Sequence, residues 1–141
     1  MTSTLAVVGL GYVGLPLAVE AAQSGFQVYG LDVSEAVVSE LNEGRSHVDD
    51  ITAPDVGGAI ARGFRATTDP SCLADADVVV ICVPTPLDGD LGPNLKAVED
   101  AATTISDHLV ARQLVVLEST TYPGTTEEVL VPILETSGLV A

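Results

Sequence analysis

Glycines at positions 9, 11 and 14 stand between an apolar run, residues 5–8, and a helix-like run that starts at Leu15. In this arrangement Gly9 allows a tight turn, Gly11 lets the backbone approach a ligand closely, and Gly14 lets the helix pack against the strand. Free N–H groups at a helix start attract anions, with help from the helix dipole. The pattern therefore predicts a site for the diphosphate of a dinucleotide. The alternative is a glycine-rich turn that binds nothing.

Asp32 ends the second apolar run, about twenty residues after the glycines, which is the spacing of a ribose-binding carboxylate. A carboxylate there accepts hydrogen bonds from the adenosine ribose hydroxyls and repels a 2′-phosphate. The residues that follow, 33–37, contain no Arg or Lys for such a phosphate, so the sequence favours NAD over NADP. Alternatively, Asp32 or Ser34 caps the next helix, and ribose binding by Asp32 is compatible with capping by Ser34.

The elements that position these residues alternate along the chain. Strands are predicted at residues 5–9, 26–32, 64–67, 77–83 and 113–118. Helices are predicted at residues 12–24, 35–42, 56–62, 95–109 and 126–136. This alternation implies right-handed crossovers and an α/β fold: a Rossmann-like, doubly wound, mainly parallel sheet with helices on both faces. Irregular segments are predicted at residues 44–54 and 84–93, and the second leaves the sheet at its carboxyl edge, where ligands bind.

Composition favours a single domain over residues 1–141, because 47% of the residues are hydrophobic and 18% are charged. The net charge of −15 should repel nucleic acid and anionic membranes, so NAD must be bound by local N–H groups. No apolar run is long enough to span a membrane. Cys72 and Cys82 lack metal-ligand spacing with the two histidines, which predicts no metal site, and two reduced thiols favour a cytoplasmic protein.

The chain resembles the N-terminal NAD-binding domain of the UDP-glucose/GDP-mannose dehydrogenase family. Three motifs carry the resemblance, stand in order and span nearly the whole chain: VGLGYVGLPLA at residues 8–18, ICVPTP at residues 81–86 and ESTTYPGTT at residues 118–126. The third motif is similar to the branch that acts on UDP-N-acetylhexosamines, particularly UDP-N-acetylglucosamine. The resemblance implies a nucleotide-sugar 6-dehydrogenase, which oxidises the C6 alcohol of a UDP-sugar to the uronic acid with two NAD per turnover.

The resemblance also implies which residues contact the cofactor. They are Gly9, Gly11, Tyr12, Val13, Gly14, Asp32, Thr85 and Thr120. It gives Thr120 a catalytic role as well, because the family's threonine positions a water near the reacting centre, and a hydroxyl both donates and accepts hydrogen bonds. The alternative for Thr85 is turn formation beside two prolines, and for Thr120 a loop cap after a strand.

In the family, the cysteine nucleophile and the catalytic lysine, asparagine and glutamate lie in segments beyond residue 141, so a substrate-binding domain is expected downstream of this chain. Cys82 is expected to be a buried strand residue and Lys96 a solvated charge. His47 is expected to be a solvated loop residue, and the alternative is that it lies near the ligand edge with a role in the site. The chain alone is therefore expected to bind NAD without turning over a sugar nucleotide. The whole enzyme is expected to be a homodimer, and this chain monomeric.

Two other interpretations stay open. One is a domain of a β-hydroxyacid or 6-phosphogluconate dehydrogenase, which shares the glycine turn and the fold. The other is a non-catalytic module that senses NAD. The fold alone does not decide among them, because this architecture hosts many functions.

Overall fold

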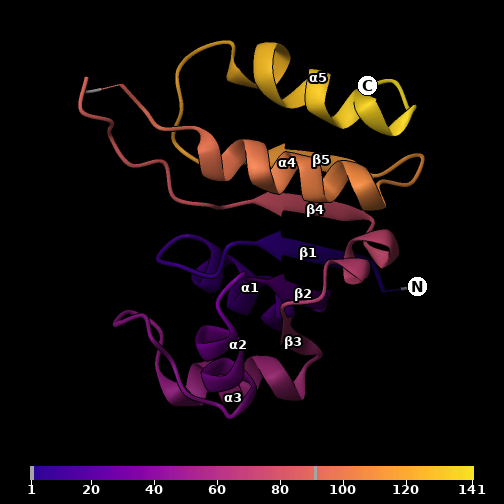
Figure 1. Ribbon diagram of the computed structural model, residues 1–141. Coiled ribbons are helices and arrows are strands. Elements are labelled where there is room, and N and C mark those ends of the chain that lie inside the picture. The colour runs from indigo at the N-terminus through magenta and orange to yellow at the C-terminus, as the bar shows by residue number, and fades with distance from the viewer. Residues whose placement is uncertain (1, 91) are drawn as a thin grey trace.

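Five strands form one parallel sheet in the computed structural model, which describes residues 2–90 and 92–141 (Figure 1). The strands are β1 (Thr4–Val8), β2 (Gln27–Leu31), β3 (Phe64–Thr67), β4 (Val78–Ile81) and β5 (Leu114–Leu117). Their order is β3-β2-β1-β4-β5, and all four pairings are parallel. The predicted doubly wound α/β fold is confirmed. The winding changes direction at β1, so the carboxyl end of β1 is the place where this topology opens a crevice.

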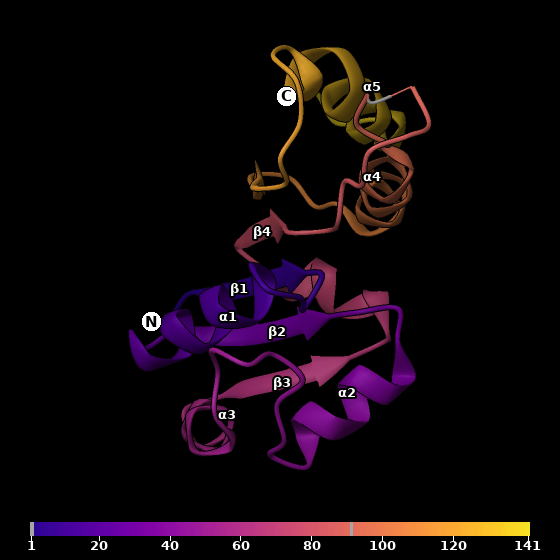
Figure 2. The same cartoon turned by 90° about the vertical axis from the view of Figure 1, so that its left-hand side faces the viewer.

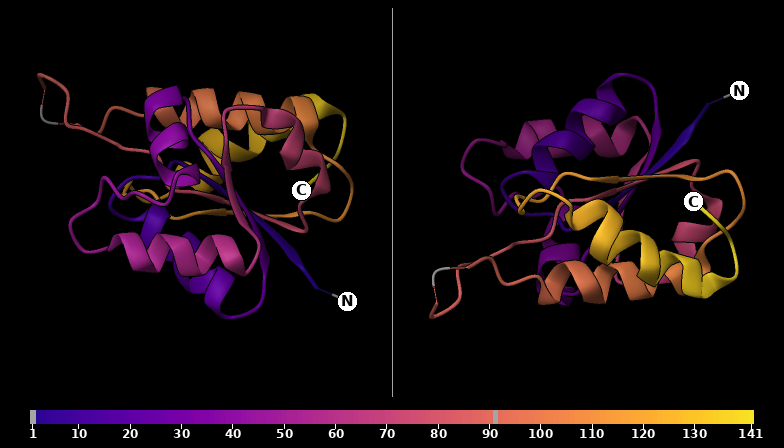
Figure 3. Two further views of the ribbon diagram at one scale, coloured as in Figure 1. Left: turned by 90° about the horizontal axis from the view of Figure 1, so that it is seen from below. Right: turned by 90° about the horizontal axis from the view of Figure 1, so that it is seen from above.

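Helices cover both faces of the sheet (Figure 3). The helical elements are α1 (Gly14–Gln23), α2 (Glu35–Asn42), α3 (Ala53–Ala61), η1 (Pro70–Asp75), α4 (Lys96–His108), η2 (Thr126–Leu130), α5 (Val131–Leu134) and η3 (Glu135–Ser137). Figure 2 shows α2 and α3 beside β3, with α4 and α5 together beyond β4. Side chains alternate along β1, so that Leu5 and Val7 join the core under α1 and α3, and Ala6 and Val8 join the core under α4.

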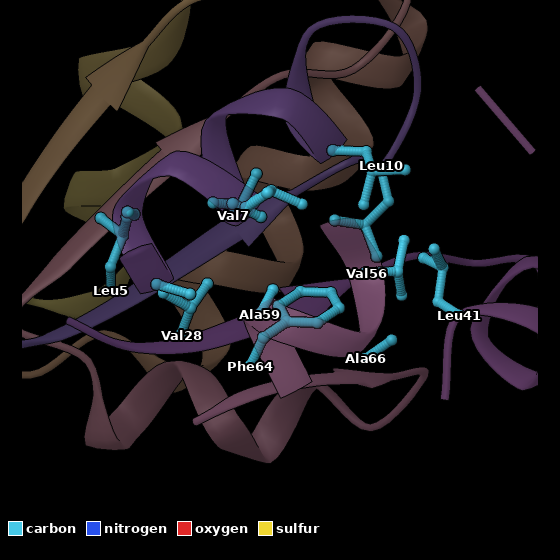
Figure 4. Packing of buried hydrophobic residues seen from close by; sticks show 14 of the residues in the cluster. Leu5, Val7, Leu10, Val28, Leu41, Val56, Ala59, Phe64 and Ala66 are labelled. Carbon is cyan, nitrogen blue, oxygen red and sulfur yellow. The ribbon is translucent and has the colours of Figure 1, made fainter. Parts of the chain in front are cut away.

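Leu10, two residues after β1, turns back into the first of these cores, near Leu41 and Val56 (Figure 4). Its side chain is fully buried. A Cβ atom added at Gly30, in the middle of β2, would lie 2.8 Å from the Leu10 Cδ1 atom. The glycine in β2 therefore leaves the space that Leu10 occupies, and this packing anchors the turn after β1 to the neighbouring strand.

Helix α3 begins three residues earlier than predicted, at Ala53, and shortens the predicted irregular segment. The cause is a capping box, in which Asp55 N–H donates to Thr52 Oγ1 over 3.2 Å and Thr52 N–H donates to Asp55 Oδ2 over 2.9 Å. The hydrogen bonds from Thr52 hold the pKa of the Asp55 carboxyl below its usual value. Pro54 fits in the first helical turn, because no N–H is required there.

The last helix is not the single α-helix predicted over residues 126–136, because it starts as the π-helical turn η2. Pro132 has no N–H to donate, and its ring clashes with the carbonyl four residues earlier in an α-helix. The turn before it is wider, and the Val131 N–H bonds to Thr126 five residues back. Leu130 and Leu134 nevertheless remain buried in the core under α4.

The short 3-10 helix η1 was not predicted, and it buries Cys72 and Leu73. Asp69 starts it by accepting a hydrogen bond from the Ser71 N–H over 2.9 Å. Cys82 lies one residue beyond β4 rather than within the strand. Across the described residues, every helix is too short or too polar to cross a lipid bilayer.

Candidate functional site

A cleft of about 920 Å³ lies where β1, β2, β4 and β5 end. Seven of the eight predicted cofactor residues line it: Gly9, Gly11, Tyr12, Val13, Asp32, Thr85 and Thr120. The eighth, Gly14, is buried in the first turn of α1. The structure thus brings residues from four separate loops together around one crevice at the carboxyl edge of the sheet.

Two of the glycines are required by close packing. Gly9 has φ +94°, and a Cβ there would lie 2.7 Å from the Cys82 carbonyl oxygen. A Cβ at Gly14 would lie 1.7 Å from the Gly9 carbonyl oxygen. A side chain at either position would push the turn away from β4 or from the first turn of α1.

Gly11 differs from its two neighbours in the motif, because a Cβ there would meet no atom within 4 Å. The N–H groups of Gly11, Tyr12 and Val13 have no acceptor among the described residues, and no side chain caps the start of α1. Unsatisfied N–H groups at a helix N-terminus favour an anion. The turn therefore offers an open backbone surface with donors for a phosphate group.

Asp32 is held by two backbone donors. Its Oδ2 accepts from the Leu10 N–H and its Oδ1 from the Ser34 N–H, each over 2.9 Å. Each carboxylate oxygen keeps a further lone pair, with which it can accept a ligand hydroxyl. Ser34 caps α2 by accepting from the Val37 N–H over 3.3 Å, as predicted. Asp32 therefore fixes the glycine turn and can also bind a ribose.

On the other side of β1, two side chains tie the loops after β4 and β5 together. The Thr85 hydroxyl donates to the Thr120 carbonyl over 2.6 Å, and the Ser119 hydroxyl donates to the Val83 carbonyl over 2.9 Å. The Thr120 hydroxyl itself makes no hydrogen bond to any described residue, and Thr120 lines the cleft. The hydrogen bond from Ser119 to Val83 was not predicted, because a serine that follows a strand can also be explained as a cap of the next loop.

The charged side chains that line the cleft are all carboxylates: Asp32, Asp100 and Glu118. Lys96 does not line it and is largely exposed, with its Nζ 3.0 Å from Asp100 Oδ2, in agreement with the predicted solvated charge. An anionic ligand must therefore be held by backbone N–H groups, against the charge of the surrounding protein.

Neither cysteine has the environment of a nucleophile. Burial and the negative charge of Glu118 raise the pKa of the Cys82 thiol to about 11. Burial and the negative charge of Asp69 raise the pKa of the Cys72 thiol to about 11 as well. Reactive thiols have a lowered pKa. The described residues also contain no group of three His, Cys, Asp or Glu side chains arranged to bind a metal ion.

The structure places His47 at the ligand edge, which the sequence left open as the alternative, so the expectation of a solvated loop residue is wrong. The side chain lines the cleft, and its Nε2 atom lies 2.6 Å from the Leu10 carbonyl oxygen. The neighbouring Val48 is 3% exposed and holds this part of the loop against the core. An apolar residue directly after the histidine was the one signal in the sequence, and a single valine in a loop is too weak to predict the contact.

Comparison with known proteins assigns nearly the whole chain to the family that its three sequence motifs resemble. Residues 3–139 match the NAD-binding domain of the UDP-glucose/GDP-mannose dehydrogenase family. The chain is 42% identical over 131 residues to the UDP-N-acetyl-D-mannosamine dehydrogenase of Salmonella typhi, covering 89% of this chain and 30% of that relative. The chain thus spans about a third or less of the relative's length.

Two solved structures agree with this result. The UDP-D-ManNAc dehydrogenase of Pyrococcus horikoshii superposes with a TM-score of 0.91 and 36% identity, over 98% of this chain and 33% of that one. A ternary complex of GDP-mannose dehydrogenase from Pseudomonas aeruginosa gives a TM-score of 0.89 and 31% identity, over 96% of this chain and 33% of that one. The cofactor is NAD, and the open turn at Gly11 and the carboxylate of Asp32 fit it. The match also decides against the β-hydroxyacid and 6-phosphogluconate alternative.

Gly11→Ala should lower NAD affinity while leaving the stability of the fold almost unchanged. The added methyl group enters open space, so we expect the free energy of unfolding to change by less than about 0.5 kcal/mol. The same methyl group would stand between the backbone and the cofactor diphosphate, so we expect NAD affinity to fall by about tenfold or more. Denaturant unfolding and calorimetric titration with NAD measure the two effects.

Gly57→Ala is the matched control, because Gly57 is an exposed glycine in α3 whose Cβ position is also open. We expect it to stabilise the fold by about 0.5–1 kcal/mol and to leave NAD affinity unchanged. Undiminished NAD binding in Gly11→Ala would contradict the assignment of the diphosphate to this turn.

The two thiols should be unreactive in the folded protein. With both pKa values near 11, about one thiol in a thousand is ionised at about pH 8. We expect a chromogenic thiol reagent to label neither cysteine until the chain is denatured, and then to label both. Labelling of the native chain should appear only as the pH rises toward about 11, and rapid labelling of Cys82 at neutral pH would refute this account of its environment.

Proposed function

Because the chain belongs to the UDP-glucose/GDP-mannose dehydrogenase family, we propose that it is the NAD-binding part of a nucleotide-sugar 6-dehydrogenase. The proposed enzyme oxidises the C6 alcohol of a UDP-sugar to the uronic acid, with two NAD per turnover. NAD, when bound, supplies the acceptor for the hydride that leaves the sugar carbon. The observation that supports this role is the cleft itself, with free N–H groups at its centre, a carboxylate on one side and two linked threonines on the other.

The strand order suggests how the dinucleotide lies. Asp32 follows β2 on one side of β1, while Thr85 and Thr120 follow β4 and β5 on the other. We assign the adenosine ribose to Asp32, the diphosphate to the N–H groups of the turn, and the nicotinamide half to the threonine side. There the free hydroxyl of Thr120 can donate to or accept from a water or a substrate oxygen near the reacting carbon.

The substrate we propose is a UDP-N-acetylhexosamine. The motif at residues 118–126 suggested UDP-N-acetylglucosamine, whereas the similar Salmonella and Pyrococcus proteins carry the name of the mannosamine epimer. We therefore favour UDP-N-acetylmannosamine. The whole protein would act in the cytoplasm, in polysaccharide biosynthesis, as a homodimer formed through parts outside residues 1–141.

Asp32→Asn tests the ribose assignment. The amide removes the negative charge that repels a 2′-phosphate, so we expect the preference for NAD over NADP to shrink by about tenfold. The amide also leaves one of the two backbone donors without an acceptor, and the affinity for NAD itself should fall. The ratio of the two dissociation constants is the informative quantity, because damage to the turn weakens both cofactors alike.

Asp100→Asn serves as the control, since it also removes a carboxylate from the cleft but from α4. We expect its NAD to NADP ratio to equal that of the wild-type protein. An unchanged ratio in Asp32→Asn would exclude Asp32 as the ribose ligand.

Catalysis should need more than this chain. We expect the purified chain to bind NAD in a calorimeter and to form no NADH with UDP-N-acetylmannosamine, because neither cysteine is a nucleophile and the family's catalytic residues lie beyond residue 141. Joined to the substrate-binding part of the Salmonella relative, the chain should form two NADH per uronic acid, with the intact relative as control. Sustained turnover by the chain alone, or a chimera that binds NAD without oxidising the sugar, would argue against this function.

A further inference from the structure

The two peptide groups around Leu10 are both held by side chains from other loops. The Leu10 N–H donates to Asp32 Oδ2 over 2.9 Å. The Leu10 carbonyl accepts from His47 over 2.6 Å. Because a carbonyl only accepts, the proton of the imidazole must be on Nε2. With its side chain fixed in the core, Leu10 has no freedom to turn about its own backbone.

His47 is itself well positioned for this contact. Ser46 Oγ accepts from the Val48 N–H over 3.1 Å and closes a tight turn around the histidine. Val48 is buried in the core beneath it. The other ring nitrogen, Nδ1, is buried and has no hydrogen-bond partner among the described residues. The Leu10 carbonyl is thus the one polar contact that the structure gives to this imidazole.

The geometry of the peptide bond links His47 to the cleft. The carbonyl of Leu10 and the N–H of Gly11 belong to the same planar, trans peptide group and point in opposite directions. When His47 holds the carbonyl on the loop side, the Gly11 N–H must point away from the loop. That N–H has no acceptor among the described residues, and the space around Gly11 is open.

We propose that His47 is a positioning residue for the cofactor, which aims the Gly11 N–H at the NAD diphosphate by holding the Leu10 carbonyl. A carbonyl that accepts a hydrogen bond also polarises its own peptide group, so the same contact strengthens the Gly11 donor. His47 acts without touching the diphosphate. The inference depends on NAD binding in this cleft and adds a residue that the glycine motif does not contain.

His47→Ala should weaken the binding of each ligand in proportion to how much that ligand uses the Gly11 N–H donor. We expect the affinities for NAD and ADP to fall by about tenfold, and that for adenosine, which has no phosphate, to stay the same. The amide nitrogen and proton shifts of Gly11 should move in the free variant, because they respond to the hydrogen bond at the preceding carbonyl. Calorimetry for NAD and ADP, and NMR titration for adenosine, measure these effects.

Two conservative variants separate positioning from general packing. In His47→Gln the amide nitrogen stands about as far from the backbone as Nε2, so NAD affinity should return to near the wild-type value. In His47→Asn the amide is one carbon shorter and affinity should stay low. His108→Ala is the control, since its Nδ1 makes a similar contact with the Thr104 carbonyl over 3.0 Å outside the turn.

Three results would overturn the proposal. They are unchanged NAD affinity in His47→Ala, an equal loss for adenosine and NAD, and equal NAD affinities for His47→Gln and His47→Asn. If His47→Ala does not unfold cooperatively, the NAD affinities of His47→Gln and His47→Asn alone test the proposal. Absence of NAD binding in the wild-type chain would instead refute the cofactor assignment, so the two failures are distinguishable.

Discussion

The close approach of the β1–α1 turn to the end of β4 is the constraint on which the site depends. At Gly9 and Gly14 the neighbouring backbone already occupies the space that a Cβ would need. The missing side chains let α1 start directly at the sheet edge, so the residues that carry its unsatisfied N–H groups line the crevice at the topological switch point. Leu10 then fixes the rotation of the turn, because its side chain fills the space left by Gly30 and both of its peptide groups are bonded to side chains. A binding surface made of backbone needs this rigidity, since it has no side chains to adjust.

The charge of the protein makes this backbone surface necessary. A chain with a net charge of −15, and with three carboxylates around the cleft, repels a diphosphate at long range. Beyond about 10 Å, salt at about 0.1 M screens most of that repulsion. Donors in direct contact are screened far less, and a helix N-terminus concentrates several of them. Local dipoles therefore decide binding, and under the proposed ribose assignment the Asp32 carboxylate adds repulsion against the additional phosphate of NADP.

The sequence predicted the sheet well because the central strands β1 and β4 are buried on both faces and read as nearly continuous apolar runs, and because Gly, Asp and Ser mark the turns between the strands. The capping box at Thr52 and Asp55 was also visible in the sequence, yet the start of α3 was placed by hydrophobic pattern alone. The π-helical turn before Pro132 was not predictable by periodicity, which assumes an α-helical spacing. The role of His47 was hidden for another reason: its contact with Leu10 joins residues far apart in sequence and exists only after both loops are packed.

The position of Cys82 shows how packing at the glycine turn conflicts with the environment that a nucleophilic thiol needs. It is the cysteine whose side chain lines the cofactor cleft, but it also forms the floor of the glycine turn, with its Cβ 3.2 Å from the place of a Cβ at Gly14. Burial that serves this packing raises the thiol pKa, and Glu118 raises it further. A nucleophilic cysteine needs the opposite environment, with partial exposure and nearby positive charge. A residue cannot satisfy both conditions in one place, so Cys82 serves the packing of the turn and not nucleophilic chemistry.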